Sequence, residues 1–252
     1  MKLFVTWSSL SMLLLWPQLV QANKALPPLP DQHYPPTAPP PNGGGHRGPC
    51  PPEDGPMKAL APREYDSGGL TLADQPTLWL YMPFDVTADM DIGIQLKISS
   101  LQTKSLTNSG IKWEFAAPVL QQGFVGIPLS STEFALPLNE PFLWTFKLYC
   151  GGVADIGQTN AYRVNAWVTR IDDTNLTQPI PETDSLQILS NAYRDNGLWY
   201  DAINVLSELM AIGSASSVVQ SAWRQLLVDG GFETTTNEFS VQYMTLPDSS
   251  IE

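Results

Sequence analysis

Hydrophobic and polar residues alternate with a period of two through the middle of the chain. Between Ile92 and Ile98, for example, every second residue is Ile or Leu. Such alternation is typical of a β-strand with one buried and one wet face. It predicts strands over 78–84, 92–98, 111–115, 142–148 and 162–168, with a weaker one over 124–129. Because no helical pattern interrupts them, we expect an antiparallel, Ig-like β-sandwich.

After Pro181 the period changes to that of a helix, with apolar residues at i, i+3 and i+4. Asn196-Gly197 and Gly230-Gly231 interrupt the pattern, which predicts three amphipathic helices. Short helices are unstable alone, so these must pack on each other and on the sandwich. The segment from Phe239 to Leu246 fits either a late strand or an ordered arm. The apolar stripes comprise Leu186, Leu189, Ala192 and Tyr193; Ala202, Val205, Leu206 and Leu209; and Val218, Val219, Ala222, Trp223, Leu226 and Leu227.

The first 22 residues have the layout of a secretory signal peptide. Lys2 precedes a mostly apolar stretch from Leu3 to Val20, and Val20-Gln21-Ala22 resembles a cleavage site. The alternative is a membrane anchor, but several Ser, Pro and Gln residues make this stretch a poor bilayer span. We therefore expect an exported protein, periplasmic or extracellular, with no membrane span after cleavage.

Residues 23–62 form a region rich in proline and glycine. Leu26 to Pro62 holds 13 of the chain's 23 prolines, and Gly43-Gly44-Gly45 adds a flexible point. Proline favours extended geometry and this region has little apolar surface, so we expect a tether. A ligand for a proline-recognising domain is the alternative. The expected plan is then a signal peptide over 1–22, a tether over 23–62, a β-sandwich over 63–178 and a helical segment with a C-terminal tail over 179–252, packed on the sandwich.

Charge and histidine placement exclude several kinds of function. The formal net charge of −12 is unsuited to neutralising phosphates, so we expect no nucleic-acid partner. Both histidines, His33 and His46, lie in the tether. The body therefore cannot assemble a Ser-His-Asp triad, a Cys-His pair or a His-ligated zinc site. We expect no cofactor.

The two cysteines, Cys50 and Cys150, are expected to form one disulfide bond, because an exported protein with two cysteines usually pairs them. The bridge would close a loop of about 100 residues, worth about 4 to 5 kcal/mol in the chain-entropy model. A redox site is the alternative, but no Cys-x-x-Cys pattern is present.

An ordered series of short segments carries a family resemblance. The segments are Arg47 to Cys50, Gly69 to Leu72, Pro76 to Tyr81, Leu148 to Cys150, Ala166 to Arg170 and Asn196 to Ala202. In this order they resemble the exported cyanobacterial family called domain of unknown function 928. The resemblance implies export, this architecture and a cyanobacterial source. It implies no activity, because the family has none assigned.

The segment from Asn191 to Ala202 also resembles part of a tetratricopeptide repeat, in which small residues let two antiparallel helices approach closely. Only one such hairpin and one further helix are present, and a single repeat forms no concave groove. We therefore expect a tetratricopeptide-like packing hairpin, with a peptide-binding groove as the alternative.

Two acidic groups offer candidate chemistry. Asp85, Asp89 and Asp91 lie in one interstrand loop and are the candidates for calcium, although their spacing is not that of an EF-hand. Glu114 and Glu133 are the candidates for a glycosidase pair. Both groups are better explained as turn residues and solvated surface charge, so we expect no metal site and no catalytic residue.

Trp167 shares the outward-facing side of its strand with polar residues. A large apolar ring in this position is expected to be shielded from water by another part of the protein. We expect the helical hairpin to provide this shielding through Trp199 or Tyr200. The alternative is a surface on which Trp167 stacks against a sugar.

These features favour a non-catalytic exported interaction or adaptor module that binds another envelope or secreted protein. A carbohydrate-binding module for cell-wall or extracellular polysaccharide is one alternative, and a carboxylate-dependent hydrolase is another.

Overall fold

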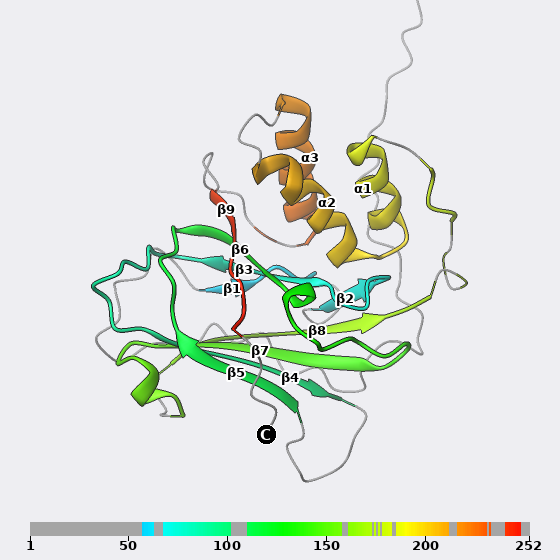
Figure 1. Cartoon of the computed structure of the whole chain (residues 1–252). Helices are drawn as coiled ribbons and strands as arrows, with labels where there is room; N and C mark the ends of the chain where they lie inside the picture. Colours follow the sequence, from blue (N-terminus) through cyan, green and yellow to red (C-terminus); the bar gives the residue numbers. More distant parts are fainter. Residues whose placement is uncertain are drawn as a thin grey trace, which may run out of the picture.

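Two β-sheets lie face to face, and three helices lie over one of them (Figure 1). The computed structural model describes residues 57–62, 68–101, 110–157, 161–172, 174, 176, 178–182, 185–211, 216–230, 232 and 240–247. The predicted signal peptide and almost all of the predicted tether lie outside these residues. Within the described ranges, no helix combines the length and the apolar character needed to cross a bilayer.

The first sheet has four strands in the order β1-β3-β6-β9. They are β1 (Lys58–Ala59), β3 (Thr77–Met82), β6 (Gly123–Pro128) and β9 (Ser240–Tyr243). The second sheet has five strands in the order β2-β8-β7-β4-β5. They are β2 (Gly68–Thr71), β4 (Gly93–Ser100), β5 (Gly110–Ala116), β7 (Pro141–Tyr149) and β8 (Tyr162–Arg170).

Five helical elements complete the described chain. Two short 3₁₀ helices are η3 (Leu129–Ser131) and η4 (Val153–Asp155). The three longer helices are α1 (Leu186–Asp195), α2 (Trp199–Ala211) and α3 (Ser217–Asp229). The chain is therefore mainly β with three C-terminal helices, and the predicted strands and helices agree with the observed ones to within a few residues.

The prediction of a purely antiparallel arrangement is wrong. β2 pairs with β8 in parallel, and β6 pairs with β9 in parallel, so both sheets are mixed. A period of two shows which residues share a face, but it carries no information about strand direction. β2 and β9 have only four residues each and reach their partners through long connections, which the alternation does not reveal.

The sandwich core lies between the two sheets. It is built from the apolar parity of each strand, as in Leu80 of β3, Leu96 of β4 and Phe146 of β7, all fully buried. Thr145 and Lys147 have the opposite parity on β7, so they lie on the outer face of the five-stranded sheet. The apolar residues of the predicted alternation thus face the core, and the polar residues lie on the outer face.

A second core lies between the four-stranded sheet and the helices (Figure 1). Trp79 of β3 and Phe124 of β6 project to this side, and the Phe124 ring meets Trp223 of α3 edge-on at 5.2 Å between centroids. β3 is apolar on both parities because both of its faces are covered.

α1 and α2 form a hairpin that turns at Gly197, whose positive φ of 76° favours glycine. Arg194 near the end of α1 makes a 3.4 Å ion pair with Asp229 at the end of α3. Gly230 follows α3 and lies directly against Trp199, since a Cβ on Gly230 would be 2.4 Å from the indole. The three helices therefore form one closely packed layer.

Candidate functional site

Trp167 is fully buried although it lies on the outer face of β8. Its strand partner on β2 is Gly68, and a Cβ there would be 2.1 Å from the indole ring. The absence of a side chain at Gly68 thus makes room for the ring. Leu70, Ile171 and Leu198 complete a small apolar cluster around it. Trp167 is therefore not available for stacking on a sugar.

Tyr200 of α2 connects the helices to the five-stranded sheet. Its hydroxyl accepts a hydrogen bond from Nε1 of Trp144 at 3.0 Å and donates one to the backbone oxygen of Trp167 at 2.8 Å. Burial raises the pKa of Tyr200 well above its usual value. The hydroxyl is therefore a neutral bridge inside the protein.

Trp199 connects α2 to the start of the body. Its Nε1 donates a 2.8 Å hydrogen bond to the backbone oxygen of Leu60, which follows β1. Trp167, Trp199 and Tyr200 are all buried, so the structure places these three predicted residues in internal contacts.

A polar pocket lies where α2 approaches the segment after β2, and Asp201 lines it. The pocket has a volume of about 170 Å³. The N–H of Leu72 donates a 3.2 Å hydrogen bond to Oδ2 of Asp201. Burial raises the pKa of Asp201 to about 6, although hydrogen bonds from the Thr71 side chain and the Leu72 backbone act in the opposite direction. The other lining residues are Thr71, Ala73, Gln75, Pro76, Thr77, Ser130, Tyr200 and Asn204.

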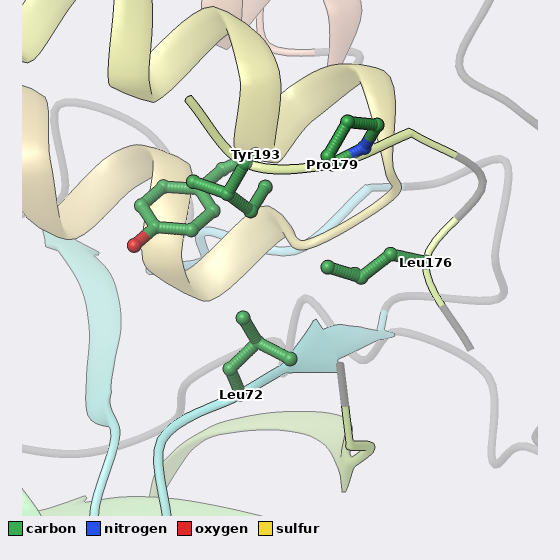
Figure 2. Close-up of a pocket in the computed structure, with 5 residues that line it drawn as sticks. Leu72, Leu176, Pro179 and Tyr193 are labelled. Atoms are coloured by element: carbon green, nitrogen blue, oxygen red, sulfur yellow. The ribbon is translucent and has the colours of Figure 1, made fainter. Parts of the chain in front are cut away.

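A larger pocket, lined by apolar side chains, lies on the other side of Leu72; Figure 2 shows Leu72, Leu176, Pro179 and Tyr193 around it. It has a volume of about 570 Å³ and is lined by Leu72, Leu176, Pro179, Ile180 and Tyr193. Most of these side chains also pack against the cluster around Trp167. The floor of the pocket is therefore continuous with the interior.

Leu72 separates the two pockets, because it lines the apolar one while Thr71 and Ala73 line the polar one.

Tyr193 and Asp201, which line different pockets, affect each other electrostatically. Burial raises the pKa of the Tyr193 hydroxyl, and the negative charge of Asp201 raises it further. The combined site offers a cavity lined largely by apolar side chains next to a carboxyl group whose charge changes near pH 6.

Asp201 is the one titratable acid that lines the polar pocket among the described residues. A glycosidase needs two carboxyl groups at a defined separation. Glu114 lies on the outer face of β5, where Gln95 and Lys112 contact it, and Glu133 is exposed beyond η3. The structure does not bring these acids together with Asp201.

The three aspartates proposed for calcium are engaged separately. Asp85 accepts a 2.6 Å hydrogen bond from the backbone of Gln122, and Asp89 accepts one from the Thr87 hydroxyl, which lowers the pKa of Asp89. The Asp91 carboxyl lies against Gly152. No group of three or more metal-binding side chains occurs in the part of the chain that the structure describes.

Cys150 follows β7 and is half-buried against the sandwich core. No cysteine among the described residues is a free thiol. Cys50 lies outside the described residues, so the bond between Cys50 and Cys150 stays a prediction.

The sequence pattern did not identify Asp201 or Tyr193 as site residues. Asp201 lies in the first turn of α2, where an acidic residue is ordinarily explained by the helix dipole. Tyr193 belongs to an apolar stripe. Asp201 is buried by packing against residues about 130 positions away, such as Leu72, and no local pattern reports this packing.

The family resemblance is supported by a direct comparison. The model of the family described as Domain of Unknown Function (DUF928) matches residues 42–239. This match covers most of the chain, so the protein belongs to that family. No curated protein matches the chain significantly.

Proposed function

We propose that this protein is a non-catalytic, exported interaction module that binds another envelope or secreted protein through the pocket lined by Leu72, Ile180 and Tyr193. The observation that carries the proposal is a cavity of about 570 Å³, lined largely by apolar side chains, beside the polar pocket of Asp201. Such a cavity suits apolar side chains of a partner, which anchor protein interfaces most strongly when they fill a pocket.

Asp201 adds specificity to this proposed site. A partner that places a cationic or hydrogen-bond-donating group next to its apolar anchor would contact the carboxylate. A partner without that group would bury the carboxylate further, with only its internal hydrogen bonds from Thr71 and Leu72. Since the carboxyl group loses its proton near pH 6, binding of a cationic group is expected to strengthen as the pH rises through this value.

The two alternatives have less support. A sugar-binding surface built on Trp167 has no exposed ring, and among the described residues the polar pocket offers a hydrolase one carboxyl group rather than a pair. The body also lacks histidine, because His33 and His46 both precede residue 57. For the architecture we propose that the sandwich is a variant of the Ig-like arrangement and that the α1–α2 hairpin is a single tetratricopeptide-like unit used for packing.

The test is site-specific photocrosslinking of the exported protein in its own cells. A photoreactive phenylalanine analogue replaces Ile180 in the apolar pocket, and in a control it replaces Val119, which is 64% exposed in the loop between β5 and β6. We expect the same one or two proteins to crosslink from position 180 and not from position 119. The variant Leu72→Asp should abolish the crosslink.

Equal crosslinking from positions 119 and 180 would refute the pocket as a binding site. Polysaccharide attached at position 180, without a recurrent protein, would favour the carbohydrate-binding alternative. Measurement at pH 5 and pH 7.5 then shows whether Asp201 contributes to binding.

A further inference from the structure

The outer face of the five-stranded sheet carries a concentration of positive charge. Four of the chain's 13 Lys and Arg residues have outward parity on neighbouring strands of this sheet. They are Lys97 of β4, Lys112 of β5, Lys147 of β7 and Arg163 of β8. The whole chain has a formal charge of −12, so this face differs in sign from the molecule as a whole.

The strand register places these cations next to each other. Lys97 lies directly opposite Lys112, and Lys147 lies directly opposite Arg163. Directly opposed residues have Cβ atoms about 5 Å apart, and like charges in such positions destabilise a sheet. The repulsion in this arrangement is expected to be relieved when an anion binds.

Among the residues that the structure describes, few acids offset this charge. Glu114 pairs with Lys112 at 3.4 Å and lies at the β5 edge, and Asp155 lies in η4 near the Gly93 end of the face. Within the described ranges, Lys97 and Lys147 make no ion pair or hydrogen bond.

A buried hydrogen-bond donor lies among these cations. Asn165 of β8 is only 3% exposed, and its Nδ2 has no hydrogen-bond partner. Its Oδ1 accepts hydrogen bonds from the Thr145 hydroxyl at 2.9 Å and from Nε of Arg163 at 3.1 Å. Because the Arg163 nitrogen can only donate, the amide oxygen must face it, which fixes the orientation of the amino group. A buried donor without a partner is costly, so this position calls for an acceptor.

We propose that this face, centred on Asn165 with Lys97, Lys147 and Arg163, is a binding site for the carboxylate groups of an acidic polysaccharide. Its groups are donors, and they match carboxylate oxygens. Tyr149 and Trp167 have the same outward parity but are fully buried, so Leu143 is the half-buried apolar residue that this face presents. The face therefore offers few of the aromatic or aliphatic anchors of a typical protein interface. A linear polymer with one carboxylate on each sugar engages several of these cations at once.

This site is separate from the apolar pocket, so it goes beyond the function proposed above and does not depend on it. The distant acidic surface does not prevent binding, because charges further apart than about 8 Å are largely screened at physiological ionic strength. The cations of the face lie close enough together to act on one ligand.

The test measures binding of the full-length exported protein to polygalacturonate by affinity electrophoresis at physiological ionic strength. Neutral dextran and polyglutamate serve as the comparison polymers. We expect retardation by polygalacturonate, little by dextran, and weaker retardation by polyglutamate. The double variant Lys97→Gln/Lys147→Gln should weaken binding by about tenfold or more, since it removes two charged donors. Lys58→Gln/Arg224→Gln has the same charge change on β1 and α3, and it should bind like the unaltered protein.

The variant Asn165→Asp replaces the unpartnered donor with an acceptor and should also weaken polygalacturonate binding by about tenfold or more. If that variant fails to fold, the comparison of Lys97→Gln/Lys147→Gln with its control still tests whether this face binds polygalacturonate. Retardation that is equal in dextran, that is stronger in polyglutamate, or that falls equally in both double variants would overturn the proposal. Absence of any polygalacturonate binding would overturn it as well.

Discussion

Asp201 is expected to make the stability of this protein fall as the pH rises from about 4 to about 6. Its pKa in the folded protein is about 6, compared with 3.8 for an unperturbed aspartate, because burial disfavours the charged form. Between these two values the folded state binds more protons than the unfolded state. The stabilisation by the proton is complete below pH 4 and is lost once the pH passes 6.

The variant Asp201→Asn isolates this effect. Asparagine keeps an oxygen that can accept the hydrogen bond from the Leu72 backbone, but it carries no charge at any pH. A difference of about two pKa units corresponds to about 3 kcal/mol. We therefore expect the free energy of unfolding of the variant, relative to the unaltered protein, to increase by about 2 to 3 kcal/mol between pH 4 and pH 7.

The assay is urea-induced unfolding at half-unit steps from pH 4 to pH 7.5, followed by tryptophan fluorescence. Asp74→Asn is the control, because it makes the same charge change at an exposed residue of the loop between β2 and β3. Only the excess effect of Asp201→Asn over this control counts. Unfolding free energies for the two variants that stay parallel across this pH range would show that the Asp201 carboxyl group is not buried as described.

Three further outcomes follow from the packing. Tyr200→Phe should lower the free energy of unfolding by about 2 to 4 kcal/mol, because it removes the hydrogen-bond acceptor of the buried Trp144 Nε1 and also the hydrogen bond to the Trp167 backbone oxygen. The control Tyr81→Phe, on a half-buried ring with one long hydrogen bond, should cost less than about 0.5 kcal/mol in the same urea titration. Gly230→Ala should lower the thermal midpoint in calorimetry, by an amount equivalent to about 1 to 3 kcal/mol, because its methyl group overlaps the Trp199 ring; an unchanged midpoint would mean that the helix layer can shift. Finally, the oxidised, denatured protein should show no thiol in a colorimetric titration, and two titratable thiols would exclude the predicted bridge.

The strands could be predicted because their physical cause is local. Ile94, Leu96 and Ile98 alternate with polar residues, since one side of β4 faces the core. The direction of β2 and β9 could not be predicted, because it depends on partners far away in the chain.

The sites were harder to predict than the fold. Trp167 could be identified as needing a cover, because its size conflicts with the polar parity of β8. Asp201 has no such conflict, since an acidic residue is ordinary at the start of a helix. The positively charged outer face of the five-stranded sheet could be predicted in part. The alternation shows that its residues point outward, but only the strand register shows that Lys147 lies opposite Arg163.

The hydrogen bond from Trp199 to Leu60 has a mechanical consequence. When the predicted Cys50–Cys150 bond is reduced, a load that enters through the residues before Met57 reaches the body at β1, which is paired with β3 through only two residues. Met57 is buried in the sandwich core and Leu60 in the core beneath the helices, while Trp199 holds the backbone of Leu60. Peeling β1 away therefore requires both cores to open together. The C-terminal helices therefore hold the segment through which the N-terminal region joins the body. Detaching β1 is expected to need a larger pulling force than its two-residue pairing with β3 alone would require.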